Sequence, residues 1–547
     1  MSKAADMAKV SVRGGFHVMW GLVASTVISA VGTIIIAILL GPDNYGLYAI
    51  ALTAPTMIVL FRDWGVNFAI VRYTAQSNAE DKTANIRSIF LSGLIFEVAL
   101  GIALSLVGFF LSDFLAVTVL NRPTIVPLIQ IASVSILTSA LVSTATAAFT
   151  GVEKMHFNSI MLVSQSFFKT ILIIALVLLG LGTYGAITGF MAATLIAGLI
   201  GVLFMFKIYK SLPKPDGHKL KIVNKVKTML KYGLPLSIGV ILGGFLVQFY
   251  NVILYNSVSD NALIGNLAIA QNFVVLITFV ATPVTTMLFP AFSKLDHRKD
   301  PETLKNVFQT SVKYASLLVV PVTAMIMALA QPAISTLFGN KYAEAPLFLA
   351  LLAVTYLYTV MGSLSIGSLI NGQGQTTFNL LIAVITAVVG FPLGFILISN
   401  YGVLGLIVTT LSASIPGTIV ALVFIKQRYN VTVHWKSSAK ILLSSAVAAA
   451  VTYMLLTQLT AFSSLIRLII GVAVFTPTYI IAAIVTKTFG TTDINNLREM
   501  LTALGPLRPI FNIILNLIEK LMTTLTPNKK QDKQQPTEKA PFQQARS

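Results

Sequence analysis

The sequence predicts an all-α polytopic membrane protein with about 14 transmembrane helices. The 547 residues are 56% hydrophobic and only 10% charged, whereas soluble domains are nearer to 25% charged. Apolar stretches of about 20 residues recur from Phe16 to Lys487, and each is long enough to cross the hydrocarbon layer as a helix. The expected spans are 16–40, 46–70, 88–112, 124–149, 157–180, 184–207, 232–255, 263–290, 314–338, 345–370, 377–399, 402–425, 438–460 and 464–486.

The basic residues indicate which side of the membrane each loop occupies. Of the 38 Lys and Arg residues, 34 lie in or beside alternate loops, and only three lie in the opposite loops. Short loops rich in Lys and Arg stay in the cytoplasm, so both termini are expected inside. The basic segments are the N-terminus, 62–87, Lys154, 207–231, 294–313, 426–440 and the C-terminal tail, whereas Arg122, Lys341 and Arg467 lie opposite.

Composition excludes several classes of function. The chain has no cysteine, which excludes disulfides, thiolate metal sites and cysteine nucleophiles. The net charge of +19 is divided among many loops, so it favours anionic lipids rather than nucleic acid as the partner. The sequence has no GxxxxGK[ST] loop and its five histidines are scattered. No ATPase site, metal or cofactor is therefore predicted, and the chain is not expected to be an enzyme.

The first half of the chain is weakly repeated in the second half. Three matches occur in order at offsets of 219, 221 and 217 residues. Because six spans separate the copies, both enter the membrane in the same direction, and we predict two parallel six-helix repeats that form an N-lobe and a C-lobe. The matching residues are 46–51 with 265–270, Gly151 and Phe157-Asn158 with Gly372 and Phe378-Asn379, and Tyr184-Gly185 with Tyr401-Gly402.

The repeat and the loop composition predict the domain organisation. Phe16–Leu40 is expected to be a retained first span, because it is too long for a signal peptide and lacks a small-residue cleavage site. The predicted parts are an N-lobe (1–208), a basic cytoplasmic linker (209–231), a C-lobe (232–427), two extra spans (428–489), inner-surface amphipathic helices (490–526) and a disordered tail (527–547).

Few charged residues lie inside the predicted spans. A charge at the bilayer centre costs about 2.5–3.5 kcal/mol, so these residues are candidates for function. Lys169 is expected near the midplane, with Gln165 one turn earlier on the same face. Glu97 lies about 15 Å up its span, and Arg62-Asp63 lies in the inner third of the second span. Either Glu97 pairs with Lys169 and Asp63 with Arg62 to fasten helices, or these groups line a wet cavity.

The second half offers only neutral polar groups at depth. They either form hydrogen bonds between helices or contact the polar part of a substrate. The residues are Gln248, Asn251, Gln271 and Asn272.

Four short segments carry a resemblance to a known family. They are 41–48 (Gly-Pro-Asp-Asn-Tyr-Gly-Leu-Tyr), 62–66 (Arg-Asp-Trp-Gly-Val) running on to Val71-Arg72, 288–295 (Leu-Phe-Pro-Ala-Phe-Ser-Lys-Leu) and 371–374 (Asn-Gly-Gln-Gly). Together they resemble the polysaccharide flippases of the multidrug/oligosaccharidyl-lipid/polysaccharide (MOP) exporter superfamily over about residues 10–430. Trp64 stands where the family pattern has Leu, and the segment after Gly490 is not part of that pattern.

The resemblance implies a flippase that works by alternating access. It would turn a lipid-linked oligosaccharide from the inner to the outer leaflet, for surface polysaccharide or glycoprotein synthesis. Arg62 and Lys169 would attract the phosphate or pyrophosphate of the polyprenyl carrier. Asp63 and Glu97 would be the candidates for coupling to H⁺ or Na⁺. The sugars would meet Gln165, Gln248, Asn251, Gln271 and Asn272.

Two other functions stay open. A cation-coupled drug or metabolite antiporter of the same superfamily would need a cation-attracting cavity and usually twelve spans. A membrane-embedded glycan polymerase or ligase would carry a large outer loop, but the longest one expected here is about a dozen residues, around 112–123. We expect a monomer in the plasma membrane of a prokaryote, with membrane lipids and glycosyltransferases or a polymerase as partners.

Overall fold

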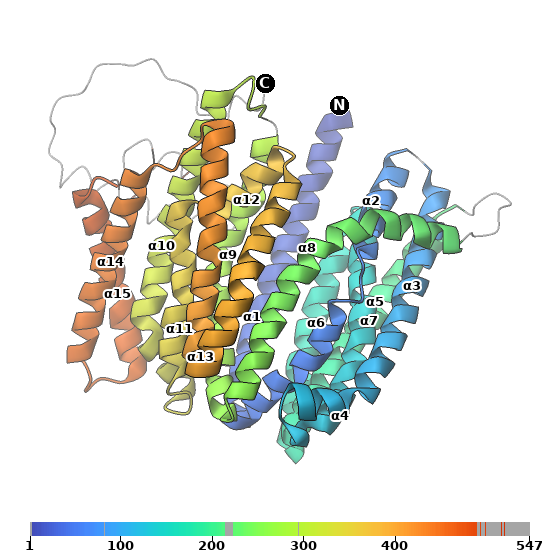
Figure 1. Ribbon diagram of the computed structural model, residues 1–547, viewed down its shortest axis with the longest axis horizontal. Coiled ribbons are helices and arrows are strands. Elements are labelled where there is room, and N and C mark those ends of the chain that lie inside the picture. The colour runs from blue at the N-terminus through green and yellow to red at the C-terminus, as the bar shows by residue number, and fades with distance from the viewer. Residues whose placement is uncertain are drawn as a thin grey trace. The chain divides into compact units, whose positions relative to one another are not determined.

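The computed structural model describes residues 3–80, 82–213, 222–293 and 295–488, together with Asp493, Arg498, Asn516 and Glu519. All regular structure in these residues is helical (Figure 1). The helices are α1 (Lys3–Val59), α2 (Val66–Ala79), α3 (Thr83–Phe110), α4 (Ser112–Phe114), α5 (Val126–Gly151), α6 (Met155–Leu176), α7 (Gly182–Ser211), α8 (Ile222–Ser257), α9 (Asn261–Ser293), α10 (Pro301–Phe338), α11 (Ala345–Ala353), α12 (Ser363–Gly372), α13 (Thr376–Tyr429), α14 (Trp435–Gln458) and α15 (Ser464–Val485).

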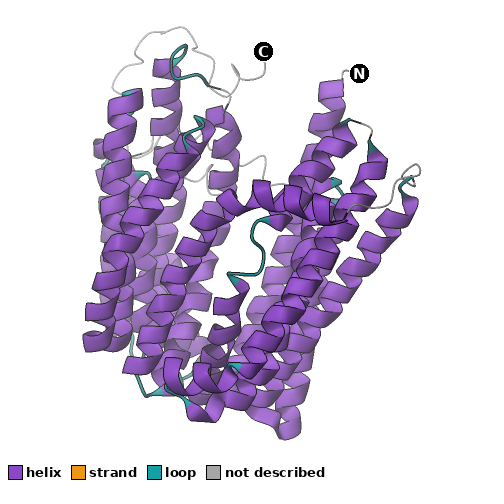
Figure 2. Ribbon diagram, turned by 45° about the vertical axis from the view of Figure 1, so that its right-hand side comes forward, coloured by secondary structure: helices purple, strands orange, loops and turns teal. Residues whose placement is uncertain are grey.

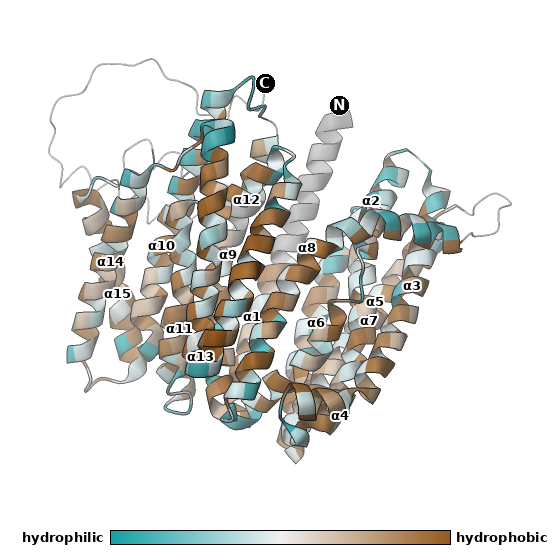
Figure 3. Ribbon diagram, viewed as in Figure 1, coloured by the Kyte–Doolittle hydropathy of each residue, from teal (hydrophilic) through white to brown (hydrophobic). Residues whose placement is uncertain are grey.

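The distribution of polarity along the helices is that of a membrane protein. Hydrophobic residues occupy the middle of the long helices, and hydrophilic residues gather at their ends and in the turns (Figure 3). Many large apolar side chains are exposed, among them Leu179, Leu203 and Val388 at 76%, 67% and 65%. Such exposure would cost free energy in water but none in lipid. The predicted class, an all-α polytopic membrane protein, is confirmed.

Ten helical stretches in the described part are long and apolar enough to cross a membrane, or eleven if the bent pair Ala345–Met361 and Ser363–Gly372 is one span. Three of the ten are 39, 57 and 54 residues long. Even the shortest of the three would extend about 58 Å if straight, nearly twice the hydrocarbon thickness. Each is broken by a glycine with positive φ, at Gly41, Gly180 and Gly402. Each therefore has the length of two spans, and the number 14 stays a prediction.

The predicted span 46–70 is not one helix. The first helix ends at Val59, residues 60–65 form a turn, and α2 begins at Val66. Figure 2 shows this break as a loop partway along a run of helix. Trp64 and Gly65 have φ angles of 45° and 79°, which a continuous right-handed helix excludes.

The chain divides into two compact units. The first comprises residues 1–269 and 390–409, and the second comprises residues 270–389 and 410–547. In the first unit, α2, α3, α5, α6, α7 and α8 share a buried core that includes Ile70, Phe90 and Phe149. The predicted lobes 1–208 and 232–427 were defined by the sequence repeat and not by contacts, and they stay a prediction. Most of the predicted segments 490–526 and 527–547, and residues 214–221 of the linker, lie outside the described residues.

Side-chain contacts recur at the offset that the sequence repeat predicts. Asn158 Nδ2 donates to Thr150 Oγ1 at 3.2 Å in the first unit, and Asn379 Nδ2 donates to Asn371 Oδ1 at 2.6 Å in the second. Both pairs span eight residues and differ by 221 in number. Nearby, Phe157 stacks on Phe204 with ring centroids 4.7 Å apart, and Phe378 stacks on Phe424 at 3.7 Å. The α5–α6 and α12–α13 turns are therefore built in the same way.

The third sequence match is displaced by three residues. It pairs Gly185 with Gly402, but the backbone pairs Gly182 with Gly402, whose φ and ψ angles are 50°, −131° and 54°, −125°. Gly185 instead corresponds to Gly405, because a Cβ on either would meet the backbone of an earlier turn, at Leu176 or Leu397. Tyr-Gly pairs are short, so the sequence alone did not fix the register.

The first residues of the matched segments, Gly46 and Gly265, lie at a close helix crossing inside the first unit. A Cβ on Gly46 would lie 2.0 Å from the Asn261 carbonyl oxygen, and one on Gly265 would lie 2.1 Å from the Pro42 carbonyl oxygen. Each glycine therefore faces the residue four positions before the other. Only glycine permits two helix backbones to approach this closely.

Two elements outside the repeat pack in the second unit. Helices α14 and α15 bury Phe475 and Ile480 against Tyr314 and Val320 of α10. Beyond α15, Asp493 accepts hydrogen bonds from Lys313 Nζ at 2.6 Å and from Tyr314 at 3.1 Å. This ion pair ties a residue of the predicted surface segment 490–526 to α10.

Candidate functional site

The break between α1 and α2 holds a buried ion pair. Arg62 is 4% exposed and Glu97 of α3 is fully buried, and Arg62 Nη1 donates to Glu97 Oε2. Arg62 Nη2 donates to Ser143 Oγ of α5 at 2.9 Å, and Asn67 Nδ2 donates to Glu97 Oε1 at 3.2 Å. Side chains from α2, α3 and α5 therefore contact Arg62 or its partner Glu97 at the break. Burying an ion pair is tolerated when both partners are also hydrogen-bonded in this way.

The local sequence holds the break in place. Asp63 Oδ1 accepts the backbone N–H of Asn67 at 2.9 Å and so satisfies a donor in the first turn of α2. Gly65 lies against α8, where a Cβ would be 2.1 Å from the Gly233 carbonyl oxygen. The positive φ of Gly65 and this close approach both require glycine. The break is therefore specified by Asp63 and Gly65, on either side of Trp64.

The ion pair lies at mid-depth. Glu97 is near the middle of α3, about 21 Å from Thr83 and about 20 Å from Phe110 along the helix. A helix of this length exceeds the hydrocarbon thickness at both ends. Because Arg62 contacts Glu97, the break is deeper than the inner third that the sequence predicted for Arg62.

Lys169 lies at a corresponding height in α6, about 21 Å from Met155. Its side chain is partly exposed, and Nζ lies 6.0 Å from the ring centroid of Phe190 in α7. No carboxylate among the described residues lies within 4.0 Å of Lys169 Nζ. The neighbouring turns of α6 pack against α1 through small residues, with Ser29 Oγ donating to Ser166 Oγ at 3.0 Å. Gln165, one turn earlier, is partly exposed.

The observed pairing differs from the pairing considered for a purely structural role. Glu97 pairs with Arg62 and not with Lys169, and Asp63 bonds to the start of α2 and not to Arg62. Sequence reasoning missed Ser143, because a small polar residue in an apolar span gives no charge signal. It also missed Phe190 beside Lys169. Only the packing of α5 and α7 brings these two residues to the charged groups.

The neutral residues predicted in the second half separate into two pairs. Gln248 is 8% exposed, and its Oε1 accepts from Asn251 Nδ2 at 3.2 Å, both in α8 of the first unit. Gln271 and Asn272 are exposed residues of α9 in the second unit. Gln248 and Asn251 therefore share a unit with Arg62 and Lys169, whereas Gln271 and Asn272 do not.

Away from the break between α1 and α2, hydrogen bonds join the loop before α5 to the α8–α9 turn of the first unit. Arg122 Nη2 donates to the Val258 carbonyl at 2.5 Å, and Arg122 Nε donates to Asn261 Oδ1 at 3.2 Å. Partial burial lowers the pKa of the Arg122 guanidinium. The first and second repeats are thus linked at this end by Arg122 and by the crossing of Gly46 and Gly265.

The described chain is an all-helical membrane protein with charged groups at mid-depth beside an interrupted helix, a combination that is also found in membrane transporters. Solved structures show where else this fold occurs. The fold is similar to the lipid II flippase MurJ in an inward closed conformation, with a TM-score of 0.67 and 18% identity, covering 85% of this chain and 98% of that one. It is also similar to an inward-facing multidrug resistance MATE family transporter of the MOP superfamily, with a TM-score of 0.57 and 17% identity, covering 74% and 94%.

The sequence itself matches the family described as polysaccharide biosynthesis protein over residues 11–296, more than half of the chain. The chain belongs to this family, and its fold is that of the MOP superfamily. Succinoglycan biosynthesis transport protein ExoT of Rhizobium meliloti is 25% identical over 332 residues, which cover 59% of this chain and 61% of that protein. The uncharacterized membrane protein MJ1375 of Methanocaldococcus jannaschii is 24% identical over 396 residues, 70% and 89% of the two chains.

Proposed function

We propose that this chain is a flippase for a lipid-linked oligosaccharide, whose sugar is joined to a polyprenyl tail by phosphate or pyrophosphate. It moves this substrate from the inner to the outer leaflet by alternating access, for the synthesis of surface polysaccharide or glycoprotein. Membership of the polysaccharide biosynthesis family and similarity to a succinoglycan transport protein support this class of substrate. The protein acts in the plasma membrane of a prokaryote, and glycosyltransferases or a polymerase are its functional partners.

The physical problem of this reaction is the polar headgroup. The polyprenyl tail stays in lipid throughout, but each unpaired polar group of the head costs several kcal/mol in hydrocarbon. The protein must therefore supply polar groups along the path. Transport needs no ATP, since an anion that leaves a negative cell interior gains about 2.3 kcal/mol per charge per 100 mV.

The observation that carries this proposal is the setting of Lys169. A partly exposed cation at mid-depth, without a carboxylate partner among the described residues, is costly unless it binds an anion. Arg62 is already neutralised by Glu97, so Lys169 is the primary phosphate-binding residue and Arg62 supports the site. Gln165, Gln248 and Asn251 bind sugar hydroxyls in the same unit, and Gln271 and Asn272 do so in the second.

Asp63 and Glu97 are the candidates for a coupling ion. Glu97 is held by Arg62 and Asn67, so a proton or Na⁺ would compete with an existing ion pair. Transport by Glu97→Gln protein, measured with and without proton and sodium gradients, decides this point. A full response to both gradients in this variant would exclude Glu97 as the coupling group.

The proposal is tested with the purified full chain in proteoliposomes that contain a fluorescent lipid-linked oligosaccharide. Loss of a charge-assisted contact costs about 1.5–3 kcal/mol, so Lys169→Gln should slow flipping roughly 10- to 150-fold. Lys169→Arg keeps the charge and should retain most of the rate. Lys210→Gln is the matched control, because Lys210 is another lysine above a phenylalanine ring, at 4.8 Å from Phe206, but at the end of α7.

Wild-type rates in Lys169→Gln protein would refute the assignment of the site. The alternative function is a drug antiporter. It would replace the proposed flippase function if the wild-type protein flips no lipid-linked oligosaccharide and if cells that lack the protein become sensitive to cationic drugs.

A further inference from the structure

Three large aromatic side chains are exposed around the break between α1 and α2. Phe61, Trp64 and Phe68 are 46%, 42% and 47% exposed. Trp64 is the residue with positive φ in the turn, and its indole Nε1 donates to the Phe61 carbonyl at 2.5 Å. The ring is therefore fixed by a local hydrogen bond, with its polar edge satisfied and its remaining surface open.

The position of the turn decides which medium Trp64 meets. Arg62 pairs with Glu97 in the middle of α3, so residues 60–65 lie at the depth of the hydrocarbon. Non-helical backbone at this depth is tolerated only when it is buried in protein or lines a water-filled space. Arg62 and Gly65 of the turn are buried, whereas Phe61, Asp63 and Trp64 have exposed surface. The partly exposed carboxylate of Asp63 would be costly in lipid at this depth. This edge of the turn therefore faces water.

A hydrated tryptophan in a transporter for glycans has a specific chemical use. The faces of many sugar rings carry C–H groups with partial positive charge, which fit against the negative π face of an indole. The sugar hydroxyls at the ring edge would meet the polar groups beside Trp64. Asp63 supplies carboxylate lone pairs beyond those that accept the Asn67 N–H and interact with Glu97.

We propose that Trp64 is a stacking platform for a sugar ring of the substrate headgroup, and that it is a determinant of glycan specificity. This inference rests on the proposed flippase function, and it assigns Trp64 a task that is distinct from phosphate binding by Lys169. The platform is rigid, because the turn is held by the hydrogen bond from the Asn67 N–H to Asp63 and by the contact of Gly65 with Gly233.

The first test asks whether the Trp64 ring faces water, and it needs no substrate. The chain has three tryptophans, so Trp20→Phe with Trp435→Phe leaves Trp64 as the only one. In lipid nanodiscs its fluorescence should be quenched by acrylamide and little affected by acyl-chain-brominated lipids. The control is Leu203→Trp in a background without the three native tryptophans.

Leu203 lies on an exposed apolar stripe of α7 with Leu195, Leu199 and Phe206, so the tryptophan introduced there should show the opposite response. Strong quenching of Trp64 by brominated lipids, with acrylamide ineffective, would place the ring in lipid and overturn the proposal.

The second test asks whether the aromatic face binds sugar. In the proteoliposome assay, Trp64→Ala and Trp64→Leu should raise the substrate concentration for half-maximal flipping about three- to tenfold, whereas Trp64→Phe should stay within about twofold. Leu keeps the apolar bulk and removes the π face, so it separates stacking from packing. Thermal unfolding of each variant reports whether the fold is kept.

The outcomes distinguish this proposal from the proposed function. If Trp64→Leu flips the substrate as well as the wild type while Lys169→Gln is impaired, the flippase reading stands and the platform is wrong. If the wild-type protein flips no lipid-linked glycan, the proposed function fails first. Addition of the soluble, delipidated oligosaccharide to the single-Trp64 protein should reduce acrylamide quenching, and an unchanged signal at saturating sugar would contradict stacking.

Discussion

Arg62 and Lys169 carry the same formal charge at similar depth, yet their surroundings are opposite. Arg62 is buried and paired with Glu97, and it also donates to Ser143, while Asn67 donates to Glu97. Lys169 is partly exposed beside Phe190 and has no carboxylate partner in the described part of the chain. A buried ion pair between helices can fasten them, whereas a charged residue without a partner inside a membrane is a candidate for binding. These surroundings support the proposal that Lys169 is the primary binding residue and that Arg62 has a mainly structural, supporting role.

This division predicts opposite effects on stability. Arg62→Leu leaves Glu97 buried without its cation, so the free energy of unfolding should fall by about 3–5 kcal/mol. Lys169→Leu removes an uncompensated charge, so stability should be unchanged or higher, even though the proposed flipping should be slowed. Thermal unfolding of the purified protein in detergent measures both effects.

The charge-balanced double variant, Arg62→Leu with Glu97→Leu, is the control and should recover much of the loss, because no lone buried carboxylate remains. Equal destabilisation by Arg62→Leu and Lys169→Leu would contradict the division of roles.

At the scale of elements, glycines set how closely the helices of the first unit approach one another. Gly65 and Gly233 face each other across the junction of α2 and α8, and Gly46 and Gly265 face each other where α1 crosses α9. In each pair the atom nearest to an added Cβ would be a backbone oxygen, which no rotamer change can move. A sequence shows that a glycine is present, but it does not show which backbone lies opposite.

Gly233→Ala should therefore destabilise the protein although alanine favours helix. A Cβ at this position would lie 2.2 Å from the Gly65 carbonyl oxygen, and such overpacking costs about 1–3 kcal/mol. The control is Gly243→Ala in the same helix, where nothing lies within 4 Å of the added Cβ. It should stabilise α8 by about 0.5–1 kcal/mol. Thermal unfolding compares the two, and a stable Gly233→Ala protein would show that the α2–α8 contact is looser than described.

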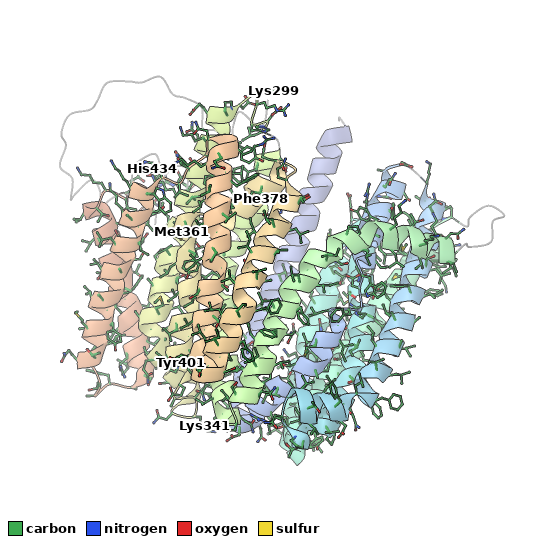
Figure 4. The ribbon with its side chains drawn as sticks, viewed as in Figure 1. Lys299, Lys341, Met361, Phe378, Tyr401 and His434 are labelled. Atoms are coloured by element: carbon green, nitrogen blue, oxygen red, sulfur yellow. The ribbon has the colours of Figure 1, made fainter. Side chains whose placement is uncertain are left out.

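At the scale of the whole molecule, the charge pattern predicts the membrane topology, and each unit can be compared with it separately. In the second unit, Lys299 and His434 lie at one end and Lys341 lies at the other (Figure 4). This agrees with the placement of 294–313 and 426–440 on one side of the membrane and of Lys341 on the opposite side. Which side is cytoplasmic stays a prediction from the excess of Lys and Arg.

The absence of cysteine makes this prediction direct to test. Lys299→Cys should react with a membrane-impermeant maleimide only after the cells are permeabilised, whereas Lys341→Cys should react in intact cells. Both side chains are exposed, so accessibility reports the side of the membrane and not burial. The wild-type chain, which has no cysteine, gives the background. Labelling in the reverse order would invert the topology and, with it, the proposed direction of flipping.

The sequence predicted the class of fold and much of the repeat, because the thickness of the hydrocarbon layer sets the length of each apolar segment and the position of each loop sets its charge. It also identified Arg62, Glu97 and Lys169 as unusual, since any charge within an apolar span is costly. It could not assign their partners. Arg62 meets Glu97 through the packing of α3 against the break, and Ser143 joins them from α5. No pattern of spacing within one helix records these contacts.

Local sequence by itself determined that this chain spans a membrane many times, that its halves are related and that a few charges lie deep within it. The free energy of transferring a segment from water to lipid depends on the residues of that segment alone, so these properties can be predicted from local sequence. Only tertiary structure decided that the second predicted span is interrupted at residues 60–65 and that Arg62 is neutralised while Lys169 is not. Only tertiary structure showed that glycines far apart in the sequence lie opposite each other where two helices cross. All of these features depend on which segments meet after the chain has folded.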